Sequence, residues 1–185
     1  GDVILDRYIS GIVGRISPEA PVPVLLHEQL HVVPGGAANV AANAVALGAH
    51  VSLVGLIGDD VFATALIEAL KRWKHIDVSG LVKDAGRQTI TKTRVMSGRQ
   101  QIVRIDNEDT TPPDADLQAR LVEQAYAAID QADILICSDY AKGVLSDEVL
   151  NKIIPRAIER NIPVIVDPKR ISFSAYQGAT LITPN

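Results

Sequence analysis

The chain has 185 residues, of which 47% are hydrophobic and 22% charged, and its formal net charge is −4. This is the composition of an ordinary globular protein, with room for one sizeable domain or for a core with a small appended element. The acidic balance and the lack of a long basic run argue against nucleic acid as the main partner. The sequence shows no signal peptide, no apolar run of about 20 residues and no second cysteine to pair with Cys137. It therefore predicts a cytoplasmic protein without a membrane span.

A glycine pair introduces the first predicted helix. Gly35 and Gly36 precede an alanine-rich run that favours a helix over residues 36–47, and Gly48 suits its end. Glycine leaves backbone amides uncovered, and the first turn of a helix presents unpaired N–H groups. Asn39 adds an amide side chain in that turn. We predict that this turn is the floor of a small-molecule site.

Helical and strand patterns alternate from residue 33 onward. Amphipathic or capped runs predict helices over residues 36–47, 59–73, 114–129 and 146–160. Short apolar runs predict buried strands over residues 51–57, 134–138, 164–167 and 181–183. This alternation predicts an α/β fold, with a mainly parallel sheet and helices on both of its faces.

Two regions break that alternation. The segment at about 8–33 is extended by its three prolines, and the β-rich runs 89–96 and 101–105 predict a hairpin. We expect these lid segments, at about 8–33 and 88–106, to form a small antiparallel β-lid beside the main domain.

Both ends of the chain look incomplete as elements of a sheet. Residues 1–6 are interpreted as the exit from a strand whose body precedes them, and residues 180–185 as a strand running into a loop. The sequence is therefore interpreted as an excerpt, truncated at both ends, from a longer protein.

Polar residues gather after the predicted strands, where open α/β sheets bind ligands. These residues are Asp2, Asp6, Asp59, Asp60, Asp139, Lys142, Asp167, Lys169 and Asn185. Carboxylates and amides pair with hydroxyl groups and lysines with phosphates, so the set suits a sugar-like substrate. Asp59 and Asp60 are better explained as the start of the next helix. For Asp139, Lys142, Asp167 and Lys169, a binding role and a structural role remain equally open.

Lys92 and Arg94 share one face of the predicted hairpin, because strand side chains alternate. They could hold a phosphate or protect a solvated edge, and Arg15 invites the same two interpretations. The four histidines have no metal-ligand spacing. The sequence also lacks a P-loop, a dinucleotide-binding G-x-G-x-x-G after a strand, and a G-x-S-x-G nucleophile elbow.

Taken in order, several motifs resemble those of the ribokinase-like (PfkB) sugar kinases. They are residues 35–39, 48–49, 55–60, 167–168 and 183–185, and the resemblance covers essentially the whole chain. Residues 1–8, 15–24, 138–143 and 167–169 are similar to the branch of this family that phosphorylates heptose 7-phosphate. Alternatives are a PfkB kinase for another sugar or a nucleoside, and a non-catalytic sugar-phosphate-binding protein.

The resemblance implies that residues 1–185 are part of a kinase domain that uses ATP and Mg²⁺. It implies transfer of the γ-phosphate to O1 of D-glycero-D-manno-heptose 7-phosphate, for ADP-heptose and lipopolysaccharide synthesis. The substrate-binding residues would be Asp6, Arg15, Gly35, Gly36, Asn39, Lys92, Arg94, Asp139 and Lys142. Those for ATP and magnesium would be Asp167, Lys169 and Asn185, with Asp167 reaching the metal through water.

Two further expectations follow from the resemblance. The β-lid would close over the sugar and build a homodimer. The family's catalytic base lies in a Gly-Ala-Gly-Asp motif that this sequence lacks. The resemblance therefore assigns the base to no residue here and implies that the 185 residues alone are inactive.

Overall fold

A computed structural model describes residues 1–184. Its helices are α1 (Ala37–Ala46), α2 (Val61–Leu70), α3 (Ala115–Ile129), α4 (Asp147–Glu159) and a short 3-10 helix, η1 (Ser174–Tyr176). Its longer strands are β1 (Val3–Ile16), β2 (Pro23–Gly36), β7 (Thr91–Ser97) and β8 (Gln100–Asn107). Its shorter strands are β3 (Val51–Ser52), β4 (Gly55–Gly58), β5 (Ile76–Asp77), β6 (Leu81–Asp84), β9 (Leu135–Ser138), β10 (Val164–Asp167) and β11 (Leu181–Ile182). None of the helices described has the length and apolar character needed to cross a bilayer.

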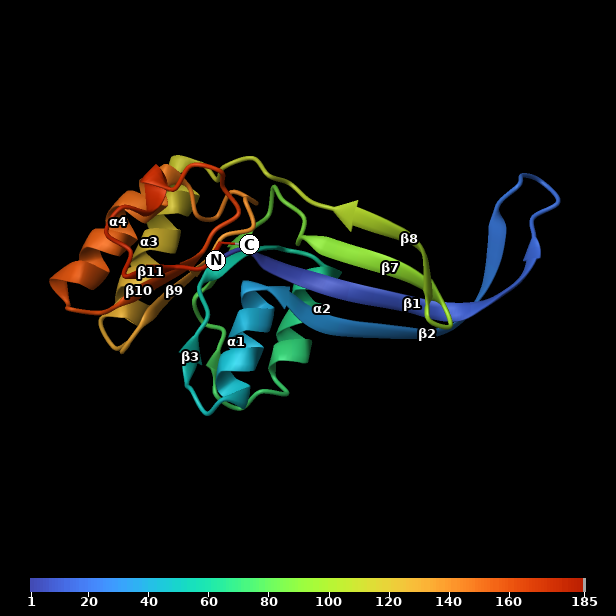
Figure 1. The fold of residues 1–185 in the computed structure, drawn as a ribbon, viewed down its shortest axis with the longest axis horizontal. Coiled ribbons are helices and arrows are strands. Elements are labelled where there is room, and N and C mark those ends of the chain that lie inside the picture. Colours follow the sequence, from blue (N-terminus) through green and yellow to red (C-terminus); the bar gives the residue numbers. More distant parts are fainter. Residues whose placement is uncertain (185) are drawn as a thin grey trace.

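The four long strands form one sheet that projects away from the helices as a lid (Figure 1). Its strand order is β2-β1-β7-β8. The outer pairs, β1–β2 and β7–β8, are antiparallel as predicted, but the central pair β1–β7 is parallel. The expectation of a wholly antiparallel lid was therefore wrong. Between β2 and β7 the chain returns to the helical body, so β1 and β7 leave that body in the same direction.

The body is the predicted α/β arrangement. Strands β9, β10 and β11 form a parallel sheet, and β3–β5 and β4–β6 are parallel pairs. Helices α3 and α4 pack with β9 and β10 around one apolar core, while α1 and α2 pack with β1 and β4 around another. Cys137 is buried in the first core, and burial raises the pKa of its thiol to about 11. Because the thiolate is the reactive form of cysteine, this buried thiol has a structural role.

Side-chain caps explain where three of the helices begin. Asp60, Asp114 and Ser146 each accept a hydrogen bond from the backbone N–H three residues further on. Helix α1 ends before Gly48, whose φ of 96° suits glycine. The predicted role of Asp60 as a helix start is thus confirmed.

One strand prediction needs correction. Residues 51–57 do not form one strand, since β3 ends at Ser52 and β4 begins at Gly55. Residues 3–6 belong to β1, which continues into the lid.

Candidate functional site

The glycine turn lies directly against the carboxylate of Asp6. Strand pairing sets Ile4 opposite Gly35, and a Cβ on Gly35 would overlap the Oδ2 atom of Asp6. Gly36 has a φ of 55°, and a Cβ there would overlap the carbonyl oxygen of Asp2. Both positions therefore require glycine, one for close approach and one also for its backbone conformation. The structure confirms that a tight glycine turn leads into α1.

The sequence predicted unpaired backbone amides at the start of α1, and the structure confirms this only in part. The N–H of Ala37, the first residue of α1, donates to the carbonyl oxygen of Asp2 at 2.8 Å. Asn39 is exposed in the first turn of α1. Its side-chain amide therefore remains accessible to a ligand beside Gly36.

Two lid cations share the sheet face that carries Asp6. Lys92 is the register partner of Asp6, and Arg94 lies two residues further along β7. The Nη1 atom of Arg94 lies 2.5 Å from Oδ1 of Asp6, and this hydrogen bond raises the pKa of Arg94. The Nζ atom of Lys92 lies 3.6 Å from the carboxylate of Asp106. Asp6, Lys92 and Arg94 are thus brought together, with each charge balanced inside the lid.

The carboxylate of Asp139 is buried and accepts hydrogen bonds from other groups of the protein. It is 4% exposed, and its Oδ2 accepts hydrogen bonds from the Tyr176 hydroxyl at 2.6 Å and from Nε of Arg170 at 3.1 Å. Its Oδ1 accepts from the N–H of Ala141 at 2.7 Å. Burial raises the pKa of Tyr176, and the hydrogen bond from its hydroxyl to Asp139 raises it further. Of the two roles that the sequence left open for Asp139, the structure favours the structural one.

Lys142 and Arg15 have contrasting positions. The Nζ atom of Lys142 lies 2.7 Å from Oε1 of Glu108, the residue that follows β8 at the base of the lid. Arg15 is exposed near the far end of β1. It stands nine residues from Asp6, roughly 30 Å along an extended strand. Within this chain, Arg15 is not brought to the glycine turn.

The predicted nucleotide-side residues follow β10. Asp167 ends that strand and is the register partner of Ser138, whereas Lys169 is exposed in the next loop. Asn185 lies outside the described residues. Tyr140, which we did not predict as a site residue, lies between the sugar-side residues and the nucleotide-side residues. Burial raises its pKa, and so do the negative charges of Asp167 and Asp6.

Sequence reasoning also missed Arg170, which joins two elements. It contacts Asp139 and Asp147 through its guanidinium group. Arginine in a polar loop carries no periodic signal, so only the fold could reveal this contact.

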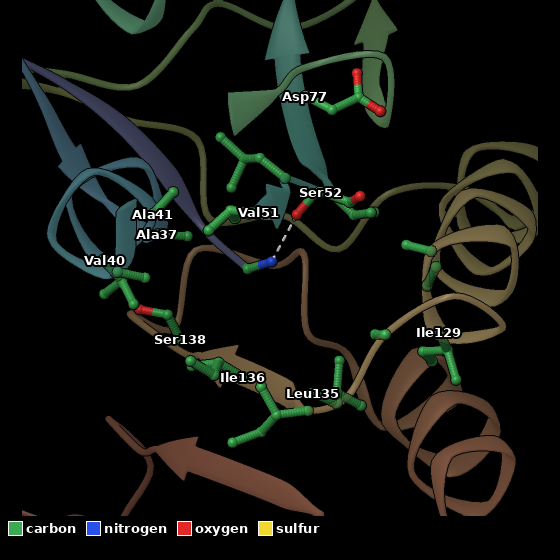
Figure 2. A pocket seen from close by; sticks show the side chains of 18 of the residues that line it. Ala37, Val40, Ala41, Val51, Ser52, Asp77, Ile129, Leu135, Ile136 and Ser138 are labelled. Carbon is green, nitrogen blue, oxygen red and sulfur yellow. Dashed lines mark hydrogen bonds between the residues drawn. The ribbon is translucent and has the colours of Figure 1, made fainter. Parts of the chain in front are cut away.

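A cavity of about 780 Å³ lies apart from these residues (Figure 2). Its lining is largely apolar and includes none of the predicted binding residues. It separates β3 from β9, each of which pairs with another described strand on its other edge. The N-terminal amine of Gly1 donates to the carbonyl of Val54 at 2.7 Å, the dashed line in Figure 2. The N–H of Asp2 donates to the carbonyl of Ser138 at 3.1 Å, so the start of the chain bridges both walls.

The described residues contain no group of three or more His, Cys, Asp or Glu side chains suited to a metal. Asp167 nevertheless offers a half-buried carboxylate that no hydrogen bond or ion pair engages within residues 1–184. Mg²⁺ prefers oxygen ligands, keeps several waters and needs few protein carboxylates. A single carboxylate acting through water therefore fits such an ion.

Known proteins share this arrangement. The model of the pfkB family of carbohydrate kinases matches residues 3–185. The chain is 64% identical over all 185 residues to the bifunctional protein HldE of Gluconobacter oxydans, and it spans 39% of that protein's length. It superposes with a TM-score of 0.68 and 16% identity on Arabidopsis thaliana ribokinase complexed with ribose and ATP, covering 100% of this chain and 58% of that one. The tetrameric inhibited form of Escherichia coli phosphofructokinase-2 gives a TM-score of 0.72 and 21% identity, with 100% and 59% covered.

The fold and the glycine turn define a sugar-kinase-like α/β protein with a β-lid. The chain belongs to the pfkB family of carbohydrate kinases.

Proposed function

We propose that the protein is a cytoplasmic kinase that transfers the γ-phosphate of ATP to O1 of D-glycero-D-manno-heptose 7-phosphate. Its product, heptose 1,7-bisphosphate, would serve ADP-heptose and lipopolysaccharide synthesis. The observation that carries this proposal is the contact between Asp6 and Gly35 beneath the cations of the lid. The 64% identity to the Gluconobacter oxydans protein over the whole chain supports it.

In this proposal the glycine turn holds the sugar. Asp6 accepts hydrogen bonds from sugar hydroxyls, the amides of Gly35 and Gly36 and the side chain of Asn39 contact the same ring, and Asp139 shapes the pocket. Carboxylates and amides are the usual partners of hydroxyls. The closed lid excludes water, so that the sugar hydroxyl is the group that meets the γ-phosphate.

The cations hold the phosphate of the substrate. Arg94 or Lys92 would contact it from the lid and Lys142 from the body, and each must then release its carboxylate partner. We also assign Arg15 to the substrate-binding residues. Since it lies roughly 30 Å from Asp6 along β1, it would reach the sugar phosphate only across the homodimer proposed below.

On the opposite side, Asp167, Lys169 and Asn185 would face the ATP phosphates. Asp167 would hold Mg²⁺ through water, and the ion, when bound, would neutralise charge on the phosphates. We assign the catalytic base to none of the 185 residues and expect the 185-residue chain by itself to show no turnover.

A substrate panel with the full-length protein tests the assignment. We expect ATP-dependent phosphorylation of heptose 7-phosphate, with a lower kcat/KM for unphosphorylated heptose, for fructose 6-phosphate and for nucleosides. Preference for an unphosphorylated sugar or a nucleoside would overturn the heptose assignment. Binding of heptose 7-phosphate without turnover would indicate a non-catalytic sugar-phosphate-binding protein instead.

We also propose that the β-lid forms a homodimer. Large apolar side chains are exposed on the lid strands and their connecting loop, namely Ile12, Ile16, Val22, Leu26, Leu30, Val103 and Ile105. Exposed large apolar side chains that neighbour one another, as the register partners Ile12 and Leu26 do, mark interaction surfaces.

Light scattering of the full-length protein tests the dimer. Leu26→Asp combined with Ile12→Asp removes a cross-strand apolar pair, which is 71% and 57% exposed, and should yield a monomer. Ile171→Asp is the matched control, since this residue is 100% exposed outside the lid. A double variant that remains dimeric would contradict the proposal.

A further inference from the structure

One buried carboxylate at the site has no part in the proposed function. Asp2 is 0% exposed and directly precedes β1. Its Oδ2 accepts hydrogen bonds from the backbone N–H groups of Tyr140 at 2.8 Å and Lys142 at 3.1 Å. Its Oδ1 accepts from the N–H of Val144 at 3.2 Å. No Lys or Arg side chain pairs with Asp2 within residues 1–184.

The loop that surrounds Asp2 has the backbone shape of an anion-binding nest. Ala141 and Gly143 have positive φ angles of 55° and 93°, and they alternate with the three residues whose amides point at the carboxylate. Successive N–H groups arranged in this way form a concave site for negative charge. The left-handed conformation is unfavourable for a non-glycine residue such as Ala141, so surrounding contacts must hold it.

The requirement for an aspartate follows from the number of donors. Three N–H groups converge on two oxygen atoms, and only a carboxylate offers acceptors on both without presenting a donor. An asparagine at position 2 would turn one oxygen into an NH₂ group that faces N–H groups. Burying an unpaired charge is expensive unless hydrogen bonds satisfy it, and here the nest supplies those bonds.

This loop carries side chains towards both halves of the proposed site. Lys142 extends from it to Glu108 at the base of the lid. Tyr140 lies on the same loop, and burial, together with the negative charges of Asp167 and Asp6, raises its pKa. The conformation that Asp2 imposes on residues 140–144 therefore decides where both groups stand.

We propose that Asp2 is a positioning residue for sugar-phosphate binding, acting through the 140–144 loop on Lys142. The proposal rests on the proposed function. In the proposed binding arrangement, Asp2 contacts no substrate atom. The loop is set in place before the substrate arrives, so that binding does not have to order it.

A double-mutant cycle in the full-length protein tests the proposal. We expect Asp2→Asn to raise the KM for the sugar phosphate at least about tenfold, with smaller changes in kcat and in the KM for ATP. If Asp2 acts through Lys142, then Asp2→Asn in a Lys142→Ala background should add less than about twofold. Asp77→Asn is the matched control, because this exposed aspartate also accepts from a backbone N–H, that of Ser79.

Amide hydrogen exchange supplies a readout that is independent of the substrate. Asp2→Asn should speed exchange at residues 140, 142 and 144, while the amides of α4 stay protected. If Asp2→Asn does not fold, Gly143→Ala replaces it in the test, because Gly143→Ala disturbs the nest and leaves Asp2 intact. A Cβ there would lie 2.8 Å from the carbonyl oxygen of Thr111. Gly143→Ala should therefore also raise the KM for the sugar phosphate.

The outcomes separate the two proposals. If the effects of Asp2→Asn and Lys142→Ala multiply, or if loop exchange does not change, the positioning role is wrong while the kinase assignment stands. If the wild-type protein turns over no sugar phosphate, both fall.

Discussion

The Nη1 atom of Arg94 lies 2.5 Å from Oδ1 of Asp6, although the two residues are 88 positions apart in the chain. Asp6 stands in β1 and Arg94 in β7, so the contact joins the two central strands of the lid. Both side chains are mostly covered, with 19% and 23% of their surface exposed. The pair therefore sets the side-chain direction of Asp6 before any substrate binds.

Arg94→Gln should destabilise the protein by about 1–3 kcal/mol, because it leaves the mostly covered Asp6 carboxylate without its charged partner. Urea unfolding of the 185-residue chain measures this. In the Asp6→Asn background, Arg94→Gln should cost less, since the carboxylate is already gone. Equal costs in the two backgrounds would show that the pair does not interact in solution.

Gly35→Ala should lower stability by about 1–3 kcal/mol and weaken sugar binding, because the new methyl group displaces the Asp6 carboxylate. Urea unfolding and the KM for the sugar in the full-length protein measure the two effects. Gly14→Ala is the control, since no atom lies within 4 Å of a Cβ built there. Similar losses for both variants would contradict the close approach at Gly35.

Asp60→Ala should cost about 2–3 kcal/mol, because it removes the cap of α2 together with two hydrogen bonds from Thr89. Burial by itself would raise the pKa of Asp60, but the hydrogen bonds from Thr89 and Ala63 outweigh it and lower the pKa. The wild-type advantage over Asp60→Ala is therefore complete above the unfolded value near 3.8 and is lost as the pH falls below it.

Urea midpoints between pH 2.5 and 7 check this prediction. Asp59→Ala is the control, since its ion pair with Lys83 is exposed and should contribute less than about 1 kcal/mol. An advantage of wild type over Asp60→Ala that does not change with pH would refute the role of the carboxylate.

The cavity between β3 and β9 predicts a response to an added strand. Five β-branched residues placed before Gly1 should pair with the edges of β3 and β9 that no strand within residues 1–184 covers, and should raise Tm by several degrees. The same extension with prolines at its second and fourth positions should not, because proline cannot donate to a ladder. Thermal melting compares the two. Equal Tm values would mean that the cavity does not accept a strand.

Local chemistry was enough to predict the helices and the glycine turn. Gly35 and Gly36, the caps at Asp60, Asp114 and Ser146, and the amphipathic runs all act within a few residues of their own position. The hairpin of β7 and β8 was visible for the same reason, since strand alternation and a short connection are local signals.

Long-range pairing was not visible in the sequence. The parallel contact of β1 with β7 and the ion pair of Asp6 with Arg94 join segments separated by more than 80 residues. The nest around Asp2 depends on backbone angles at Ala141 and Gly143, which no periodicity encodes. Asp139 and Asp2 are both buried aspartates beside strand ends, and only their hydrogen-bond partners distinguish their roles.

The sequence by itself determined the four main helices and most of the longer strands. It also predicted that a glycine turn with nearby carboxylates and cations would suit a phosphorylated sugar. Only the tertiary structure decided which of those charges meet: Arg94 with Asp6, Lys142 with Glu108, and the Asp2 carboxylate with three amides. The physical reason is that helix and turn preferences are properties of neighbouring residues. An ion pair or a nest, by contrast, exists only once strands distant in the chain have packed side by side.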